Sequence, residues 1–174
     1  MPNWCFNHLY ITGDKESLDK FASQVDEGAE SGDDLSIIET FLPFPDDLGD
    51  GWYDWCVTNW GTKWGDCHTR REEAGEGLHY VFDTAWSPPI EAIISISKLF
   101  PDLKFVIVYE EGGMGFMGGD YIRNGETVMD VSVPYPEIPD IDEDDLPYDP
   151  YDALNDAVFQ KFNKLADDLR AAAR

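Results

Sequence analysis

Cys56, Cys67 and His68 are the residues whose types are best suited to chemistry, because thiolates and imidazoles bind zinc or act as nucleophile and base. Structural zinc sites usually contain C-x(2–4)-C pairs, whereas ten residues separate the two cysteines. No third group that would orient a Cys67–His68 pair can be named. We therefore expect no metal ion, no catalytic residue and no enzymatic activity here.

A second candidate is the G-x-G-x-x-G pattern formed by Gly113, Gly115 and Gly118. In dinucleotide-binding proteins these glycines open a helix, whose N-terminus holds the pyrophosphate. Here a β-hairpin is expected to follow. We interpret the glycines as a bend or bulge and expect no cofactor.

Four of the six tryptophans fall within thirteen residues, between Trp52 and Trp64. Such a cluster either fills a core or builds a recognition surface. One hypothesis is a small-ligand pocket with His68 nearby, lined by Trp52, Asn59, Trp60, Lys63, Trp64 and Trp86. The alternative, which we favour, is that Lys63 forms a cation–π or ion-pair contact that locks this stretch onto the sheet.

The chain carries 36 acidic against 12 basic residues, a formal net charge of −24. This charge excludes direct binding of nucleic acid or an anionic membrane. It reflects either solubility or a specific acidic function, and clustering of the acids favours function. The predicted partner-binding acids are Asp33, Asp34, Asp46, Asp47, Asp50, Asp140, Asp142, Glu143, Asp144, Asp145 and Asp149.

Three cysteines without framework spacing argue against a disulfide-stapled secreted fold. The first residues lack the features of a signal peptide, and no run approaches the roughly 18 apolar residues that a membrane span needs. We expect a cytoplasmic protein.

These residues must be positioned by a sheet with helices. Strands are expected at residues 3–12, 36–42, 78–84 and 104–110, helices at 14–26 and 87–100, an irregular insertion at 46–77, and a hairpin at 116–123 and 126–133. This order predicts an α+β protein with the ferredoxin-like β-α-β-β-α-β pattern and an antiparallel sheet, which the hairpin extends or covers.

The first strand carries Trp4, Phe6, His8 and Tyr10 on one parity. Aromatic residues on such a sheet can stack RNA bases, but the negative charge excludes that function. We expect the tryptophan insertion or the last helix to cover this face, and His8 to be a hydrogen-bonded core histidine.

Residues 1–134 are expected to form the domain, 135–150 an acidic linker and 151–174 an amphipathic helix. Its apolar stripe is Leu154, Val158, Phe162, Leu165 and Leu169. The helix folds back on its own domain, our first choice, or exchanges between two copies in a homodimer.

Three short segments resemble one protein family: residues 1–7, which begin Met-Pro-Asn-Trp-Cys, residues 59–64, Asn-Trp-Gly-Thr-Lys-Trp, and residues 84–89, Thr-Ala-Trp-Ser-Pro-Pro. Together they are similar to phage- and plasmid-borne YubB-type proteins with a ferredoxin-like domain. The resemblance covers about residues 1–125. It implies a ferredoxin-like fold without an iron–sulfur cluster and an origin on a mobile element, and it transfers no catalytic residue.

These observations lead to two functional hypotheses. The first is a small acidic inhibitor that mimics DNA and binds a host nucleic-acid-binding defence complex, of the CRISPR or restriction type, in the host cytoplasm. The second is a ligand-binding or enzymatic domain that uses the tryptophan-lined pocket.

Overall fold

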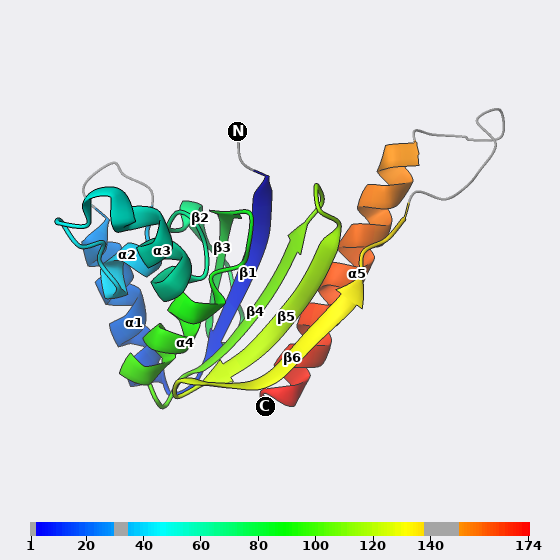
Figure 1. Ribbon diagram of the computed structural model, residues 1–174. Coiled ribbons are helices and arrows are strands. Elements are labelled where there is room, and N and C mark those ends of the chain that lie inside the picture. The colour runs from blue at the N-terminus through cyan, green and yellow to red at the C-terminus, as the bar shows by residue number, and fades with distance from the viewer. Residues whose placement is uncertain (1–2, 30–34, 138–149) are drawn as a thin grey trace.

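The computed structural model describes residues 3–29, 35–137 and 150–174, and side chains of the last helix from Leu154 onward. Its elements are β1 (Trp4–Thr12), α1 (Lys15–Gly28), α2 (Ile38–Phe41), a 3-10 turn (Gly49–Gly51), α3 (Trp52–Trp60), β2 (Cys67–Glu72), β3 (Leu78–Ala85), α4 (Ile90–Leu99), β4 (Lys104–Glu111), β5 (Phe116–Arg123), β6 (Glu126–Pro134) and α5 (Pro150–Ala172). Figure 1 shows one sheet with α1 to α4 on one side and α5 on the other.

The sheet has six antiparallel strands in the order β2-β3-β1-β4-β5-β6. Its first four strands, together with α1 and α4, form the ferredoxin-like β-α-β-β-α-β unit predicted from the sequence. The β5–β6 hairpin extends the sheet beyond β4. Its turn has Asn124 and Gly125 at φ 48° and 80°, the left-handed conformation that a two-residue hairpin requires.

The prediction of a strand at residues 36–42 is wrong. Leu35 makes only an isolated bridge to Thr69, and the chain then turns into the short helix α2. The backbone N–H groups of Ile37 and Ile38 donate to the carboxylate of Asp66, at 2.8 Å each, instead of to a neighbouring strand. An apolar pair such as Ile37-Ile38 can be buried equally well by a helix, and here both side chains are inaccessible.

The second strand of the fold is β2, which lies inside the stretch predicted to be an irregular insertion. Its sequence, Cys-His-Thr-Arg-Arg-Glu, has no apolar alternation because β2 is an edge strand, with β3 as its one neighbouring strand among the described residues. Charged residues on an edge strand prevent pairing with other chains. Residues 46–77 therefore contain α3 and a component strand of the sheet.

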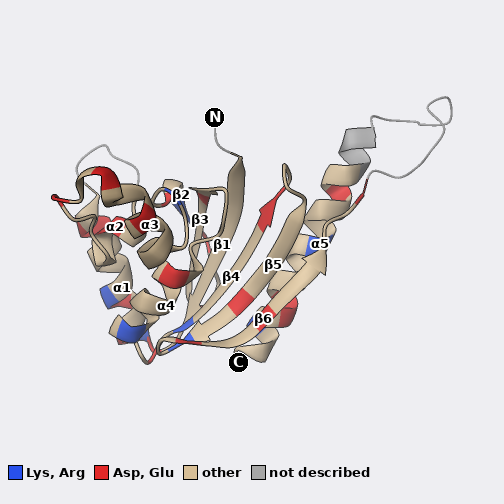
Figure 2. Cartoon of the chain, in the orientation of Figure 1, with Lys and Arg blue, Asp and Glu red and all other residues tan. Residues whose placement is uncertain are grey.

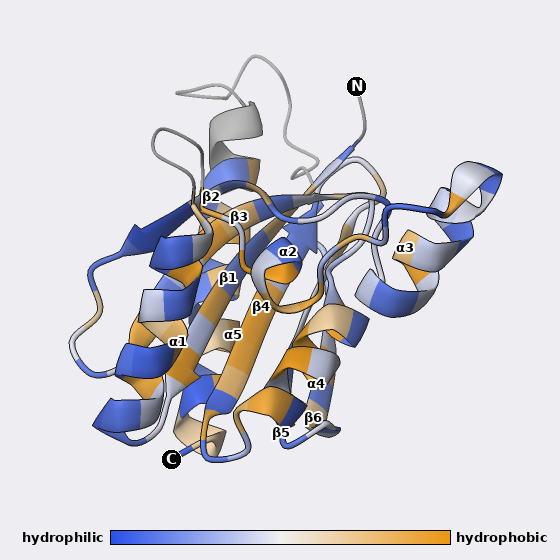
Figure 3. Ribbon diagram, turned by 90° about the vertical axis from the view of Figure 1, so that its left-hand side faces the viewer, coloured by the Kyte–Doolittle hydropathy of each residue, from blue (hydrophilic) through white to orange (hydrophobic). Residues whose placement is uncertain are grey.

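The main core lies between the sheet and helices α1 and α4. It includes Leu9 and Ile11 of β1, Phe21 and Val25 of α1, and Ile93 and Ile96 of α4. Asp14 caps α1, as predicted, by accepting a hydrogen bond from the Ser17 N–H at 3.0 Å. In Figure 3 the apolar residues of β4 lie behind these helices.

Helix α4 begins at Ile90, three residues later than predicted, and Ser87 does not cap it. The Ser87 hydroxyl donates instead to the carbonyl of Gly61, at 2.8 Å. This contact ties the start of α4 to the end of α3.

The opposite face of the sheet is covered by α5. Phe162, Leu165 and Leu169 are buried against Val106, Val108, Met117 and Tyr121, whereas Leu154 and Val158 are half-buried. The helix thus packs on its own sheet in this structure, the arrangement of our first choice. Among the described helices, none has the length and apolar character needed to span a membrane.

Candidate functional site

The three tryptophan-centred segments meet at one end of the sheet, and we call residues 3–5, 59–64 and 84–89 the tryptophan junction. The backbone N–H of Trp86 donates to the backbone carbonyl of Asn3 at 3.0 Å. The hydroxyl of Thr62 donates to the carbonyl of Ala85 at 2.9 Å and is almost inaccessible to solvent. Together with the Ser87–Gly61 bond, these contacts fasten the three segments to one another.

Lys63 lies between two of the rings of the junction. Its Nζ is 4.9 Å from the ring centroid of Trp64 and 4.4 Å from that of Trp86. Trp4 contacts Trp64 at 6.2 Å between ring centroids. The favoured alternative for Lys63, a cation–π contact, is therefore present, and its ammonium is shared by two ring faces.

Backbone geometry brings these rings together. Gly61 ends α3 in the left-handed conformation, at φ 79°, so the chain reverses between Trp60 and Lys63. Trp86 has φ 72°, which is costly for a bulky non-glycine residue. The surrounding hydrogen bonds hold Trp86 in this conformation, with its ring against Lys63.

A hollow of about 420 Å³ lies beside the junction. Of the predicted pocket residues, Trp52, Trp60, Lys63 and Trp64 line it. Trp60 is buried, with its Nε1–H donating to the Leu42 carbonyl at 3.1 Å, whereas Trp52 and Trp64 are exposed. The tryptophan cluster thus combines a buried core residue, Trp60, with an open hollow lined by aromatic side chains.

Two predicted pocket residues lie elsewhere. Asn59 donates from Nδ2 to the Trp55 carbonyl at 2.9 Å and lines a separate hollow with Trp55. Trp86 contacts Lys63 but does not line the 420 Å³ hollow.

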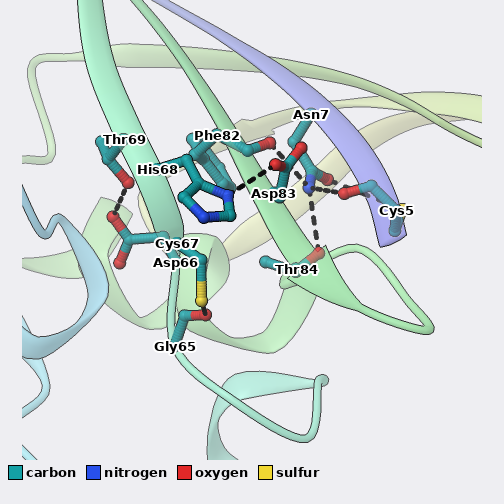
Figure 4. Close-up of polar contacts among 10 residues, drawn as sticks. All are labelled: Cys5, Asn7, Gly65, Asp66, Cys67, His68, Thr69, Phe82, Asp83 and Thr84. Carbon is teal, nitrogen blue, oxygen red and sulfur yellow. Dashed lines mark hydrogen bonds and ion pairs between the residues drawn. The ribbon is translucent and has the colours of Figure 1, made fainter. Parts of the chain in front are cut away.

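Beneath the junction, Asn7 forms a polar centre that sequence reasoning missed. This fully buried side chain donates from Nδ2 to the carbonyl of Cys5 at 2.8 Å and to Oγ1 of Thr84 at 2.9 Å (Figure 4). Burial raises the pKa of the Cys5 thiol well above its usual range. Cys5 therefore stays a protonated, unreactive thiol at neutral pH.

Asp66 was also missed and organises the other side of the hollow. Besides the two α2 N–H groups, its carboxylate accepts hydrogen bonds from Ser36 Oγ at 3.1 Å and Thr69 Oγ1 at 2.6 Å. Because four donors satisfy this buried carboxylate, Asp66 has a structural role.

The exposed His68 and the half-buried Asp83 form a polar pair at the site. His68 Nδ1 lies 3.0 Å from Asp83 Oδ2, and the edge of the His68 ring faces Trp4 at 5.6 Å. His68 has φ 52° and lies where the β2–β3 register shifts, a bulge that turns its side chain toward Asp83 (Figure 4). An imidazole oriented by a carboxylate can accept or donate a proton at its other nitrogen.

Of the residues considered for a zinc site, Cys56 and Cys67 line the 420 Å³ hollow, whereas His68 does not. Cys56 is buried in a small core with Ile38, Trp60 and Ala92. Cys67 Sγ lies 3.6 Å from the Gly65 carbonyl, while His68 is directed to Asp83. Within residues 3–29, 35–137 and 154–174, no three Cys, His, Asp or Glu side chains are grouped as metal ligands.

Gly113, Gly115 and Gly118 lie at the β4–β5 connection and in β5. The turn is held by the Glu111 carboxylate, which accepts the N–H groups of Gly113 and Met114 at 2.8 and 2.6 Å. Strand β5 begins at Phe116, inside the glycine pattern, and continues into the predicted hairpin. A dinucleotide site would have a helix N-terminus at this place.

Three of the predicted acidic residues are described, and all three are exposed: Asp46, Asp47 and Asp50, in the loop before α3. Figure 2 shows acidic residues on α2, on α3 and on the loop between them. The other predicted acids, Asp33, Asp34, Asp140, Asp142, Glu143, Asp144, Asp145 and Asp149, lie outside the described residues, as does most of the predicted linker.

Comparison with known proteins gives a family and a fold. A family model described as a ferredoxin-like domain in Api92-like protein matches residues 59–146. The crystal structure of protein api92 from Yersinia pseudotuberculosis superimposes with a TM-score of 0.58 at 12% sequence identity. The alignment covers 80% of this chain and 100% of api92.

No curated protein matches this sequence. The family match includes the second and third tryptophan-centred segments, and the structural match supports the ferredoxin-like fold. The chain belongs to the family of ferredoxin-like domains found in Api92-like proteins.

Proposed function

We propose that this protein acts by binding a basic host protein that itself binds nucleic acid, and that it occupies the DNA-binding surface of that partner. The observation that carries the proposal is a surface beside the tryptophan junction, which we call the aromatic–acidic surface. It exposes Phe44, Trp52, Tyr53 and Trp64 next to Asp46, Asp47, Asp50 and Asp54.

The composition of this surface suits a basic partner. Between Lys20 and Lys63 the sequence contains ten acidic residues and no Lys, Arg or His. Lys63, the nearest cation along the chain, is held between two tryptophan rings. Tryptophan and tyrosine are the residues that most often anchor protein interfaces, and surrounding charges steer the partner.

The net charge of −24 supports a competition with DNA. Double-stranded DNA presents about one negative charge per 1.7 Å of its axis. A compact acidic protein can occupy a groove that evolved for this charge density. We infer that the partner belongs to a host defence complex and that the chain is of the phage- or plasmid-borne YubB type, acting in the host cytoplasm.

The test is capture of partners from host lysate, followed by competition with duplex DNA. We expect captured nucleic-acid-binding proteins that DNA displaces and that dissociate between about 50 and 500 mM salt. Replacing Asp46, Asp47 and Asp50 by Asn should weaken capture at least tenfold. The control replaces Glu73, Glu76 and Glu126 by Gln, the same charge change at exposed sites elsewhere.

Trp52→Ala should weaken capture, whereas Leu99→Ala, which removes an exposed apolar side chain at the end of α4, should not. If the captured proteins do not bind nucleic acid, or if both acidic triples behave alike, the proposal is wrong.

A second candidate is a small-ligand site in the 420 Å³ hollow. Its volume is within the range of ligand pockets. The charged residues Glu39 and Lys63 line it together with aromatic side chains. Thermal shifts with a metabolite panel test it: stabilisation that Trp52→Ala abolishes favours the ligand site, and an unresponsive panel rejects it.

A further inference from the structure

Another hollow, of about 280 Å³, lies between the sheet and the first half of α5, away from the aromatic–acidic surface. Its walls are mainly aromatic and include Phe6 of β1, Tyr135, and Phe159 and Phe162 of α5. Phe6 is 41% exposed and Phe159 68% exposed, so ring surface is open to an incoming group. We call this hollow the α5 groove.

Among the described residues, Glu110 contributes the one carboxylate that lines the α5 groove. Glu110 on β4 pairs directly with Phe6 on β1, so both side chains are on the face of the sheet that α5 covers. The Tyr135 hydroxyl donates to Glu110 Oε2 at 3.1 Å. This bond fixes the carboxylate at the wall of the groove.

Glu110 has no cationic partner among the described residues: none of their ion pairs includes it. Burial raises the pKa of Glu110. The hydrogen bond from Tyr135 opposes this rise, and the charge of the adjacent residue Glu111 adds to it. A half-buried carboxylate surrounded by aromatic rings gains most from a cation that also packs on those rings.

We propose that the α5 groove binds the guanidinium group of an arginine side chain from the basic partner. The inference rests on the proposed function and adds to it a second contact with the same partner, on the face of the sheet that α5 covers. A guanidinium is planar, pairs with a carboxylate through two parallel N–H bonds and stacks on aromatic faces. The side chains of Asn155 and Asn163 also line the groove and can accept its remaining N–H groups.

Charge decides against two other occupants. An apolar side chain would bury Glu110 without a counter-charge. A second copy of this chain brings a net charge of −24 toward an already negative surface.

The experiment titrates the full-length protein with acetyl-Gly-Arg-Gly-amide at 150 mM salt and pH 7.5, using the side-chain amide NMR signals of Asn155 and Asn163 as local reporters. We expect saturable shifts. Glu110→Gln should weaken binding at least tenfold, and Glu110→Asp, which keeps the charge on a shorter side chain, by an intermediate factor. Glu126→Gln, the same charge change at the far hairpin, should alter binding less than twofold.

The peptide with neutral citrulline in place of arginine should not bind, and the lysine peptide should bind several-fold more weakly. Equal effects of Glu110→Gln and Glu126→Gln, or no shift of the two amide signals, would show a general attraction to an acidic protein and overturn the inference. The titration needs no host protein. If the peptide binds through Glu110 but lysate capture finds no nucleic-acid binder, only the proposed function fails.

Discussion

His8 and His79 are hydrogen-bonded to each other beneath α5, with Nδ1 of His8 3.1 Å from Nε2 of His79. Phe162 covers the His8 ring edge-on at 4.8 Å, and the Tyr10 ring stacks on His79 at 4.3 Å. Such a bond between two imidazoles requires that at least one ring is neutral. His8 is thus hydrogen-bonded, as expected, but it is half-buried and its partner is a second histidine.

The His8–His79 pair makes stability depend on pH. Burial, then His79 and Arg70, lower the pKa of His8 from 6.5 to about 4, against the opposing charge of Glu72. Burial also lowers the pKa of His79, with Arg70 and Arg170 acting in the same direction and Glu72 against it. On α5, Arg170 lies over the Tyr10 ring, with Asp167 near Tyr10.

Unfolded chains take up a proton at His8 near pH 6.5, whereas the folded protein does so only near pH 4. The stability that depends on neutral His8 is therefore complete above pH 6.5 and is lost as pH falls toward 4. We expect His8 to account for about 2 kcal/mol of the decrease, allowing for partial solvent access. Urea unfolding of His8→Gln should show a flatter pH profile between pH 4 and 6.5 than that of the wild type. Parallel profiles for wild type and His8→Gln would contradict this.

Asp120 has the opposite dependence. It is 4% exposed and lies directly opposite Asp130 on β6, and its carboxylate accepts no hydrogen bond from any described residue. Burial, then Asp130, raise the pKa of Asp120 to about 6. Because the folded pKa is raised, the associated stability is complete below about pH 4 and is lost as pH rises through 6.

Asp120→Asn removes this buried charge. We expect it to stabilise the protein at pH 7.5 by about 1–2 kcal/mol and to have little effect at pH 4.5, measured by chemical denaturation. Glu126→Asn, at an exposed position of β6, serves as control. A destabilised Asp120→Asn at pH 7.5 would show that the carboxylate has a favourable role.

Lys63 should stabilise the tryptophan junction through its charge. Lys63→Met keeps most of the aliphatic packing but loses both cation–π contacts, so we expect a loss of about 1–2 kcal/mol in unfolding free energy. Lys63→Arg should retain most of it. Lys15→Met, at a highly exposed position of α1, should change stability by less than about 0.5 kcal/mol. Equal values for both Met variants would rule out a role for the cation.

Helix α5 should be required by the sheet that it covers. Leu169 is 1% exposed, and Leu169→Ala should cost about 2–4 kcal/mol, whereas Phe159→Ala should cost little. Deletion of residues 137–174 would expose Val106, Val108 and Tyr121, which α5 covers. We expect the truncated protein to aggregate and the full chain to be a monomer, as measured by light scattering. A dimeric full chain that yields a stable monomeric truncation would indicate exchange of α5 between copies.

The sequence alone determined the features that depend on neighbouring residues. Asn124-Gly125 has few good conformations other than a tight hairpin turn, and Asp14 can satisfy the N–H of Ser17 three residues away. The alternation of β1 and the stripe of α5 require only that one face of each element be buried. These local requirements predicted the ferredoxin-like order of elements, but they assigned its second strand to residues 36–42 instead of to β2.

Only the tertiary structure decided the features that join distant residues. Residues 36–42 form a helical turn because Asp66 takes the N–H groups of Ile37 and Ile38, and β2 is a strand because β3 offers it an edge. The contact of Lys63 with Trp86, the His8–His79 bond and the Tyr135–Glu110 bond likewise join residues far apart in the chain. Periodicity reports which face an element buries, but the partner on that face is set by packing of the whole chain.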